Sequence, residues 1–513
     1  MNSWNEGYFT ESTYTYGYYR ELSPNFMRLC LLLNGYLAPE ITADSCHCEL
    51  GFGQGVSANI HAAATPGRFF GTDFNPSHAT NANDLADASG ADAKFFEDSF
   101  EEFSKREDLP AFDTIGLHGI WTWVSAENRR HIVEIARQHL KSGGMFYNSY
   151  NCLPGWAPSA PLRELLSVYD RYLGKSGAAK GRVEESLKFV EGMLDAKPAY
   201  AALAPNFAKT FEGLKKQNPN YLAHEYLNLD WDLMYFADVA EICQEAKLDF
   251  AAAAVPIEIV DKLNISAPAA EFLKTITNPI VKEQARDYFI NRQFRKDIFI
   301  RGMRKITPLE RLDKLLEMRY VLLTPAESVP LKFVTTGGEV NLSPEVYRPI
   351  LEFLQEDNFR PKSFNDYLKN KPAQEAYGLL EIITILINNN HIAPCQNEAA
   401  IKQVKKSCER LNAHICERSK FEDAINFLAS PLTGLGVAVN RFQQIFLLQY
   451  KAGDKTADKL AAASWKIISR QGQKLINNGK TIDSPEENLE HLKKIAESFL
   501  ANQLPIFKAL LLV

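Results

Sequence analysis

The chain has 513 residues, a length that exceeds a single hydrophobic core and suggests about three domains. Hydrophobic residues form 46% of it, and the net charge of −6 argues against the basic surface that binds nucleic acid or anionic membranes. No apolar run reaches the roughly 18 residues that cross a bilayer, and the first residues lack the pattern of a signal peptide. We therefore expect a cytoplasmic protein with no nucleic-acid partner and no membrane insertion.

The first predicted unit, residues 1–40, is an aromatic segment followed by a helix. Four tyrosines, among them Tyr16 and Tyr18, stand close together here. They could pack on the surface or form a lid that stacks on a ligand, because aromatic rings bring large contact area at low entropy cost. Pro24, at a first helical position, predicts that a helix begins after them.

A glycine-rich turn follows, between a short predicted strand at 46–48 and a predicted helix at 56–64. The turn consists of Glu49, Leu50, Gly51, Phe52, Gly53, Gln54 and Gly55. Glycine lets the backbone turn sharply and lets a ligand approach closely. The start of the next helix offers free N–H groups and a positive dipole end. Strand, glycine turn and helix in this order indicate a nucleotide-like ligand at the first crossover of an α/β sheet.

The strand before the turn, Cys46-His47-Cys48, contains residue types that bind metals. Side chains alternate along a strand, so the two cysteines face one side and His47 the other, and the three cannot converge on one ion. The eight cysteines are dispersed along the chain, which is typical of reduced thiols. We expect no metal site.

The second predicted strand, 68–73, ends at Asp73, about 20 residues beyond the glycine turn. In a dinucleotide-type unit an acidic side chain at this point accepts hydrogen bonds from ribose hydroxyls. Phe74, directly after it, is a further candidate for the same ligand. Together, the glycine turn and this acidic residue indicate a nucleotide-like ligand more strongly than the turn does alone.

The third predicted strand, 93–98, ends at the edge where open α/β sheets bind ligands. There Asp98 or Ser99 could accept the amine of an adenine, and Phe100 could cover the ring. Alternatively, Asp98 caps the helix that begins near Ser99.

Two more strands are predicted at 111–117 and 144–150. Strands and helices alternate from residue 41 to 156, which predicts an α/β Rossmann-like domain with a mostly parallel sheet and helices on both faces. His118, Trp121 and Tyr150 lie at or after the ends of these strands.

The order of glycine turn, Asp73, Asp98 and the strand around Asp113 resembles the motif series of class I S-adenosylmethionine-dependent methyltransferases. Those enzymes carry an acidic residue and then Gly-x-Gly-x-Gly, which residues 49–55 keep, whereas nicotinamide dehydrogenases normally carry Gly-x-Gly-x-x-Gly. The resemblance implies that S-adenosylmethionine is the cofactor, S-adenosylhomocysteine the product, and that no metal is needed. It assigns the donor site to residues of the turn and of the strand ends that follow: Glu49, Gly51, Phe52, Gly53, Gln54, Gly55, Asp73, Phe74, Asp98, Ser99, Phe100 and His118.

A second resemblance covers nearly the whole chain. It rests on residues 16–24, 118–123, 149–156, 224–227, 294–299 and 431–434. These segments are similar to a bacterial group that carries a methyltransferase regulatory domain after the catalytic domain. The group includes the rickettsial-type protein lysine methyltransferases that act on outer-membrane proteins. The resemblance implies a homodimer, but members of the group need not share one substrate.

Residues 157–328 lack the strand–helix alternation and predict a mostly α-helical middle domain, the regulatory one. Helical periodicity is found at 162–173, 184–194 and 228–247. Asp230 and Asp232 could be general bases or form a ligand site, but capping of the apolar helix that follows is favoured. Residues 298–300 predict a strand, either at an edge of the catalytic sheet or in a separate small sheet.

Residues 329–513 predict a C-terminal domain with a winged-helix-like start, followed by further helices. A hairpin is expected at 331–342, and a helix is expected to begin at Ser343-Pro344. Winged-helix modules usually bind DNA, but fold does not settle function. No helix rich in arginine and lysine is found in this stretch, so we expect protein docking or dimerisation.

Methyl transfer needs mainly alignment and a deprotonated nucleophile. We expect Tyr16, Tyr18, Trp121 and Tyr150 to line the acceptor site, where aromatic walls favour a neutral lysine and hold a methylated cation. His118 could contact substrate, act as a base or be structural. The sequence therefore predicts a methyltransferase acting on lysine side chains of a surface or outer-membrane protein. The alternatives are a small-molecule methyltransferase and a non-catalytic S-adenosylmethionine-binding regulator.

Overall fold

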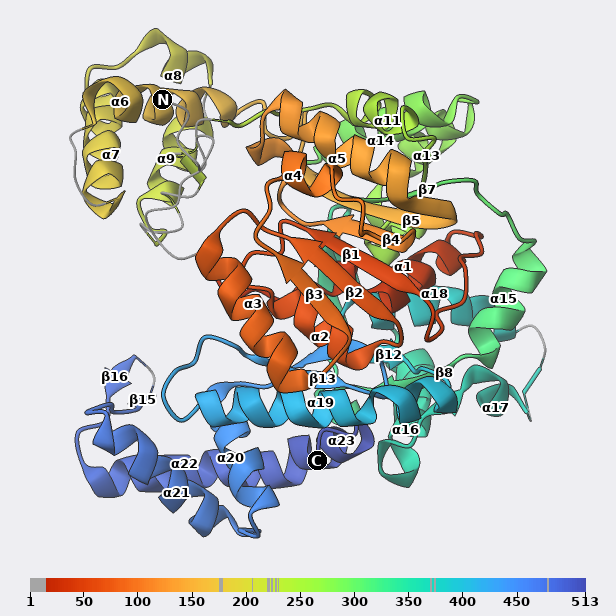
Figure 1. The fold of residues 1–513 in the computed structure, drawn as a ribbon, viewed down its shortest axis with the longest axis vertical. Helices are drawn as coiled ribbons and strands as arrows, with labels where there is room; N and C mark the ends of the chain where they lie inside the picture. Colours follow the sequence, from red (N-terminus) through yellow and green to blue (C-terminus); the bar gives the residue numbers. More distant parts are fainter. Residues whose placement is uncertain are drawn as a thin grey trace.

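A computed structural model describes residues 15–174, 179–204, 206–218, 222, 225, 226, 228, 230–369, 371, 372, 375–477 and 479–513. Figure 1 shows a twisted sheet in the middle of the molecule, a small helical lobe at one end and a larger, mostly helical part at the other. No helix in the described ranges has the length and apolar character needed to cross a membrane.

The central sheet has seven strands in the order β3-β2-β1-β4-β5-β7-β6. They are β1 (Cys46–Leu50), β2 (Arg68–Thr72), β3 (Ala93–Phe96), β4 (Phe112–Leu117), β5 (Leu140–Asn151), β6 (Asp249–Ala253) and β7 (Phe294–Ile300). Strands β1 to β5 are parallel, while β7 runs antiparallel to both β5 and β6. The five predicted strands and their parallel arrangement are confirmed.

Helices cover both faces of the sheet, as predicted. One face carries α1 (Pro24–Leu33), α2 (Val56–Ala64) and α3 (Pro76–Ser89), and the other α4 (Phe100–Ser104), α5 (Ala126–His139) and α11 (Phe236–Gln244). Each face has its own buried cluster, because side chains alternate along every strand. On β5, for example, Tyr147 belongs to the first cluster and Phe146 to the second.

Two strands of the catalytic sheet come from beyond residue 156, where we expected the catalytic domain to end. The run 298–300 lies inside β7, which pairs with β5 on one side and β6 on the other, so it is neither an edge strand nor part of a separate sheet. A helical insertion separates β5 from β6 in the sequence and hides the strand alternation. The strands of the central sheet therefore extend to Ile300 in the sequence.

The insertion forms the small lobe in Figure 1. It contains α6 (Ala160–Leu173), α7 (Ala179–Asp195), α8 (Ala199–Leu203) and α9 (Asn206–Leu214), around a small core of its own. The helices predicted at 162–173 and 184–194 are thus confirmed. The third predicted helix starts only at Phe236, with Tyr235 as its N-cap. Asp230 and Asp232 lie before it in extended chain, so the capping interpretation is wrong.

Between β6 and β7 the chain forms four short helices, the last of which packs beside α11. They are η3 (Pro256–Ile259), α12 (Asp261–Asn264), α13 (Ala267–Lys274) and α14 (Pro279–Ile290). Arg295 on β7 is fully buried against α14, where its guanidinium binds Asp287 at 2.6 Å and Glu283 at 3.0 Å.

The C-terminal part is mostly helical. Its helices are α15 (Pro308–Glu317), η4 (Ala326–Ser328), α16 (Pro344–Phe359), α17 (Phe364–Leu368), α18 (Glu375–Asn388), α19 (Glu398–Arg418), α20 (Arg441–Lys451), α21 (Ala457–Arg470), α22 (Pro485–Ser498), the π-helical turn η5 (Phe499–Gln503) and α23 (Leu504–Ala509). Its strands are β8 (Arg319–Leu322), β9 (Lys332–Thr335), β10 (Gly338–Asn341), β11 (Lys362–Ser363), β12 (Ile392–Pro394), β13 (Phe427–Ser430), β14 (Leu435–Ala438), β15 (Ile476–Asn477) and β16 (Lys480–Thr481).

The winged-helix-like start is partly as expected. The hairpin β9–β10 and the helix at Pro344 are confirmed. The helices α16, α17 and α18 pack with a three-stranded sheet, β11-β8-β12, which the sequence did not predict because its strands are very short and far apart in the chain.

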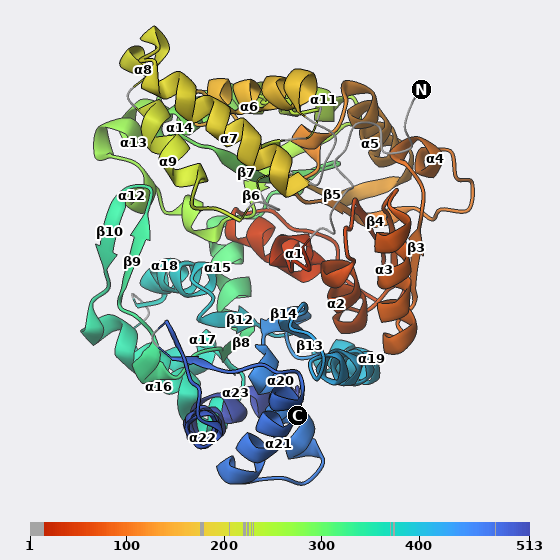
Figure 2. The ribbon, with the colours of Figure 1, turned by 90° about the vertical axis from the view of Figure 1, so that its left-hand side faces the viewer.

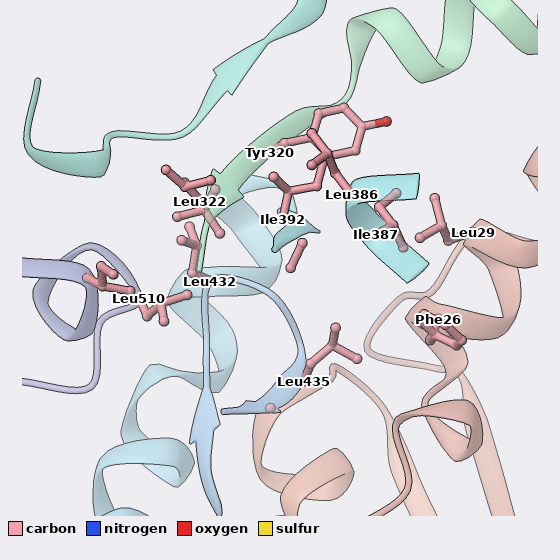
Figure 3. Close-up of a cluster of buried hydrophobic side chains, with 14 of the residues drawn as sticks. Phe26, Leu29, Tyr320, Leu322, Leu386, Ile387, Ile392, Leu432, Leu435 and Leu510 are labelled. Carbon is pink, nitrogen blue, oxygen red and sulfur yellow. The ribbon is translucent and has the colours of Figure 1, made fainter. Parts of the chain in front are cut away.

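The C-terminal part shares its core with the catalytic domain. Figure 3 shows Phe26 and Leu29 of α1 in one buried cluster with Ile387 of α18 and Leu432. Helix α19 packs against α2 and α3, and Figure 2 shows it directly below both of them. Every residue of α2 is buried as a result.

Residues of the C-terminal part also cap the end of α2. Gln396 Nε2 donates to the carbonyl of Ala64 at 2.8 Å, and the Ser407 hydroxyl donates to the carbonyl of Ala63 at 2.7 Å. The last carbonyls of a helix have no partner within it, so side chains from elsewhere satisfy them here. The helix after the glycine turn therefore depends on residues more than 300 positions away.

Candidate active site

A cleft of about 1170 Å³ opens at the carboxyl ends of β1 to β4. This is where open α/β sheets bind their ligands. Of the predicted donor-site residues, all but Gly55 line it: Glu49, Gly51, Phe52, Gly53, Gln54, Asp73, Phe74, Asp98, Ser99, Phe100 and His118.

The glycine turn needs its glycines for backbone and packing reasons. Gly51, Gly53 and Gly55 have φ values of 71°, 57° and 72°, in the left-handed region that other residues rarely adopt. Gly55 is the N-cap of α2 and does not line the cleft. A Cβ there would lie 2.5 Å from the Cβ of Ala82, so Gly55 allows α2 and α3 to pack closely instead of contacting a ligand.

Asp73 is held in place from two sides. One carboxylate oxygen accepts the N–H of Gly53 at 2.8 Å. The other accepts the N–H of Asn75 and lies 3.0 Å from Nδ1 of His78. A carboxylate has about four acceptor positions, so it retains capacity for the hydroxyls of a ribose. Its position suits the predicted role.

Asp98 lies at the end of β3, where Arg106 donates to its carboxylate at 2.9 Å. The N-cap of α4 is Ser99, whose hydroxyl accepts the N–H of Glu102 in a capping box. The interpretation of Asp98 as the cap is therefore wrong, and its carboxylate is directed to Arg106 and the cleft.

Two polar groups in the cleft, the buried Gln54 and the half-buried Glu49, match the chemistry of S-adenosylmethionine. The Gln54 side chain is 3% exposed, and its Nε2 finds no hydrogen-bond partner among the described residues. Burial, with a smaller contribution from the charge of Asp73, raises the pKa of Glu49 to about 8. A ligand with an amino-acid end offers a carboxylate for an amide donor and an ammonium for Glu49. With Asp73 and Asp98, these residues fit the methyl donor.

The other half of the cleft lies beyond β4. His118 stacks on the ring of Tyr19 with centroids 3.9 Å apart, and its Nδ1 lies 2.8 Å from the Tyr147 hydroxyl. Burial lowers the pKa of the imidazole to about 4, so His118 is neutral at pH 7. Trp123 and Asp230 complete this half of the cleft.

Residues 15–22, here called the strap, cross the cleft. The N–H of Tyr19 donates to the Ser57 hydroxyl at 2.8 Å, and Glu21 pairs with Lys296 at 2.7 Å. Arg20 donates to two carbonyls at the end of α18. Thr15, Gly17, Tyr19 and Leu22 of the strap line the cleft, while residues 1–14 lie outside the described part of the chain.

The four aromatic residues predicted for the acceptor site do not line the cleft. The hydroxyl of Tyr18 accepts the N–H of Gly436 at 2.6 Å, and Tyr16 packs against the shared core. Trp121 and Tyr150 are fully buried. Trp121 donates to the Met234 sulfur, and Tyr150 donates to Asp297 at 2.7 Å.

The cleft is lined instead by sequence neighbours of these residues, Tyr19 and Trp123. Tyr18 and Tyr19 are adjacent in an extended segment, so their side chains point to opposite sides. Trp121 and Trp123 begin and end a 3-10 turn, where three residues complete one turn, so their side chains also point in different directions. Asp230, for which a ligand site was the less favoured alternative, lines the cleft because the chain returns there after the insertion. There Trp231 packs on Trp156, with centroids 5.4 Å apart, and on Trp123 at 6.4 Å.

Two family models match the chain. One, described as a methyltransferase domain, matches residues 48–144, and the other, a predicted methyltransferase regulatory domain, matches residues 218–301. The second range contains α11, α14, β6 and β7. It therefore includes two strands of the catalytic sheet.

The chain is 41% identical over 512 residues to the uncharacterized protein sll1526 of Synechocystis, covering 99% of both chains. It is 24% identical over 521 residues to the uncharacterized protein RP789 of Rickettsia prowazekii, covering 95% of this chain and 91% of that one. The structure of PKMT2 from Rickettsia typhi in complex with AdoHcy has the same fold, with a TM-score of 0.66, 18% identity, and coverage of 95% and 98%. The chain belongs to the family of S-adenosylmethionine-dependent methyltransferases that carry a methyltransferase regulatory domain.

Proposed function

We propose that this methyltransferase acts on lysine side chains of a protein. The observation that carries the proposal is the lining of the cleft beyond β4, where Tyr19, Trp123 and Asp230 lie together. Aromatic faces attract ammonium and methylammonium groups, and a carboxylate favours the same charge. The resemblance to the rickettsial protein lysine methyltransferases, and the fold shared with PKMT2, agree with this acceptor.

Bound S-adenosylmethionine supplies an activated methyl group on a sulfonium. The chain's own residues hold and orient the reactants: Glu49, Gln54 and Asp73 on the donor side, and the strap on the acceptor side. A lysine has a reference pKa of about 10.4, and low-dielectric aromatic walls favour its neutral, nucleophilic form. His118, with a pKa of about 4, is too weak a base to take the lysine proton at pH 7. We assign it the role of supporting the Tyr19 ring.

The test is incubation with radiolabelled S-adenosylmethionine, an extract of outer-membrane and surface proteins, and a panel of small metabolites. Label on protein lysines is the expected result. Label on metabolites alone would make the protein a small-molecule methyltransferase, and donor binding without any transfer would make it a regulator. Asp230→Asn should reduce lysine labelling while leaving donor affinity unchanged. Asp249→Asn, at an exposed position on the edge strand β6, is the control.

A further inference from the structure

The acceptor half of the cleft is built from two segments that are distant in the sequence. One is the turn after β4, which contains η2 (Trp121–Trp123) and ends at Val124. The other is residues 230–234, where the chain returns from the insertion. Trp123 and Val124 line the cleft from the first segment, and Asp230 lines it from the second. Their relative position sets the shape of the site.

Arg129 on α5 joins these two segments. Its side chain is 6% exposed, so the guanidinium is almost fully enclosed. Nη1 donates to the carbonyls of Val124 at 2.8 Å and Trp121 at 3.3 Å. Nη2 forms an ion pair with the carboxylate of Asp232. One rigid planar group therefore holds both segments at once.

The backbone supports the same junction. The N–H of Asp232 donates to the carbonyl of Thr122 at 2.9 Å. Further along, the N–H of Leu153, just beyond the end of β5, donates to the carbonyl of Met234 at 3.1 Å. Only the Arg129 side chain, among the contacts described here, links the carboxylate of residue 232 to the carbonyls of the turn. Without the Arg129 side chain, the carbonyls of Trp121 and Val124 lose a donor and the Asp232 carboxylate loses its partner.

We propose that Arg129 is a positioning residue that sets the affinity for the protein acceptor. It acts through Trp123 and Asp230, by holding the two segments that carry them at a fixed separation. The proposal rests on the proposed function for the identity of the acceptor, but the junction itself does not. Arg129 lies outside the lining of the cleft, so donor binding should not depend on it.

The test compares Arg129→Gln, Arg129→Lys and Asp232→Asn with Arg130→Gln, a control at an exposed position on the same helix. We expect Arg129→Gln to raise the KM for the methylated protein about tenfold, with kcat and the affinity for AdoHcy changed less than about twofold. The KM of Arg129→Lys should lie between the values of the unaltered protein and of Arg129→Gln, because one ammonium group cannot replace the planar guanidinium. Adding Asp232→Asn to Arg129→Gln should change the KM little further, because both substitutions remove the same Arg129–Asp232 ion pair.

A second measurement needs no acceptor. Four of the six tryptophans lie at this junction: Trp121, Trp123, Trp156 and Trp231. Acrylamide should quench their fluorescence more strongly in Arg129→Gln and Asp232→Asn than in Arg130→Gln. If quenching rises but no protein is methylated, the junction stands and the proposed acceptor falls.

Unchanged quenching would overturn the proposal whatever the acceptor is. An unchanged KM, or an equal loss of AdoHcy affinity, would also overturn it. If Arg129→Gln does not fold, Asp232→Asn tests the same link, because the Asp232 side chain is 63% exposed and its loss is tolerable.

Discussion

Glu49 makes donor binding dependent on pH in a way that can be measured. Burial raises the pKa of its carboxyl to about 8, so at pH 7 about nine tenths of the protein carries it protonated. An ammonium group beside it favours the ionised form and lowers its pKa in the complex. A group whose pKa falls on binding releases its proton, and affinity then rises with pH until the free pKa is passed.

The size of the change in donor affinity with pH follows from the pKa of Glu49 in the protein without ligand. The ionised fraction of a group with a pKa of about 8 grows about 50-fold between pH 6 and pH 8. A donor α-amino group with an ordinary pKa near 8 loses about half its charge by pH 8, which limits the net gain in affinity to about 25-fold. At pH 7 binding should release about 0.8–0.9 proton.

The assay is calorimetric titration with AdoHcy at pH 7 in two buffers of different ionisation enthalpy. Glu49→Gln should bind more weakly and release almost no proton. Asp98→Asn, also in the cleft, should still release it. Binding of AdoHcy to the unaltered protein without proton release, or equal release by Glu49→Gln, would rule out Glu49 as the group that loses the proton.

Three further changes test the site and its support. Asp73→Ala should weaken AdoHcy binding about 100-fold, since it removes a charged acceptor and the partner of the Gly53 N–H; unchanged affinity would rule Asp73 out as a donor-site residue. Gln396→Ala should destabilise the fold by about 1–3 kcal/mol in urea unfolding, because the Ala64 carbonyl at the end of α2 loses its donor. Gly55→Ala should lower the melting temperature, because φ of 72° costs a non-glycine residue about 1–2 kcal/mol; an unchanged melting curve would contradict this.

The donor half of the site could be predicted from the sequence because its signals are local. Asp73 directly follows β2, and Asp98 lies two residues beyond β3. The carboxyl ends of parallel strands lie at one edge of the sheet. Asp73 and Asp98 therefore needed only the strand pattern and the glycine turn to be placed correctly.

The acceptor half could not be predicted in the same way. Tyr18 and Tyr19 are equivalent in a motif, and only packing against Gly436 and His118 decides which of them faces the cleft. Asp230 reaches the cleft through an ion pair between Asp232 and a distant helix, which no local pattern indicates. Strand β7 pairs with β5 across an insertion, and such pairing depends on tertiary contacts.

The region matched as a regulatory domain is also a structural part of the catalytic domain. It supplies β7, the direct neighbour of β5, and the fully buried Arg295, whose guanidinium binds Asp297 at 2.7 Å. Asp297 in turn accepts from Tyr150 on β5. Removing this region would expose the edge of β5 and leave buried polar groups without partners, which costs several kcal/mol. A chain that lacks it should lose AdoHcy binding and solubility together, whereas a purely regulatory attachment would leave a soluble, donor-binding remainder.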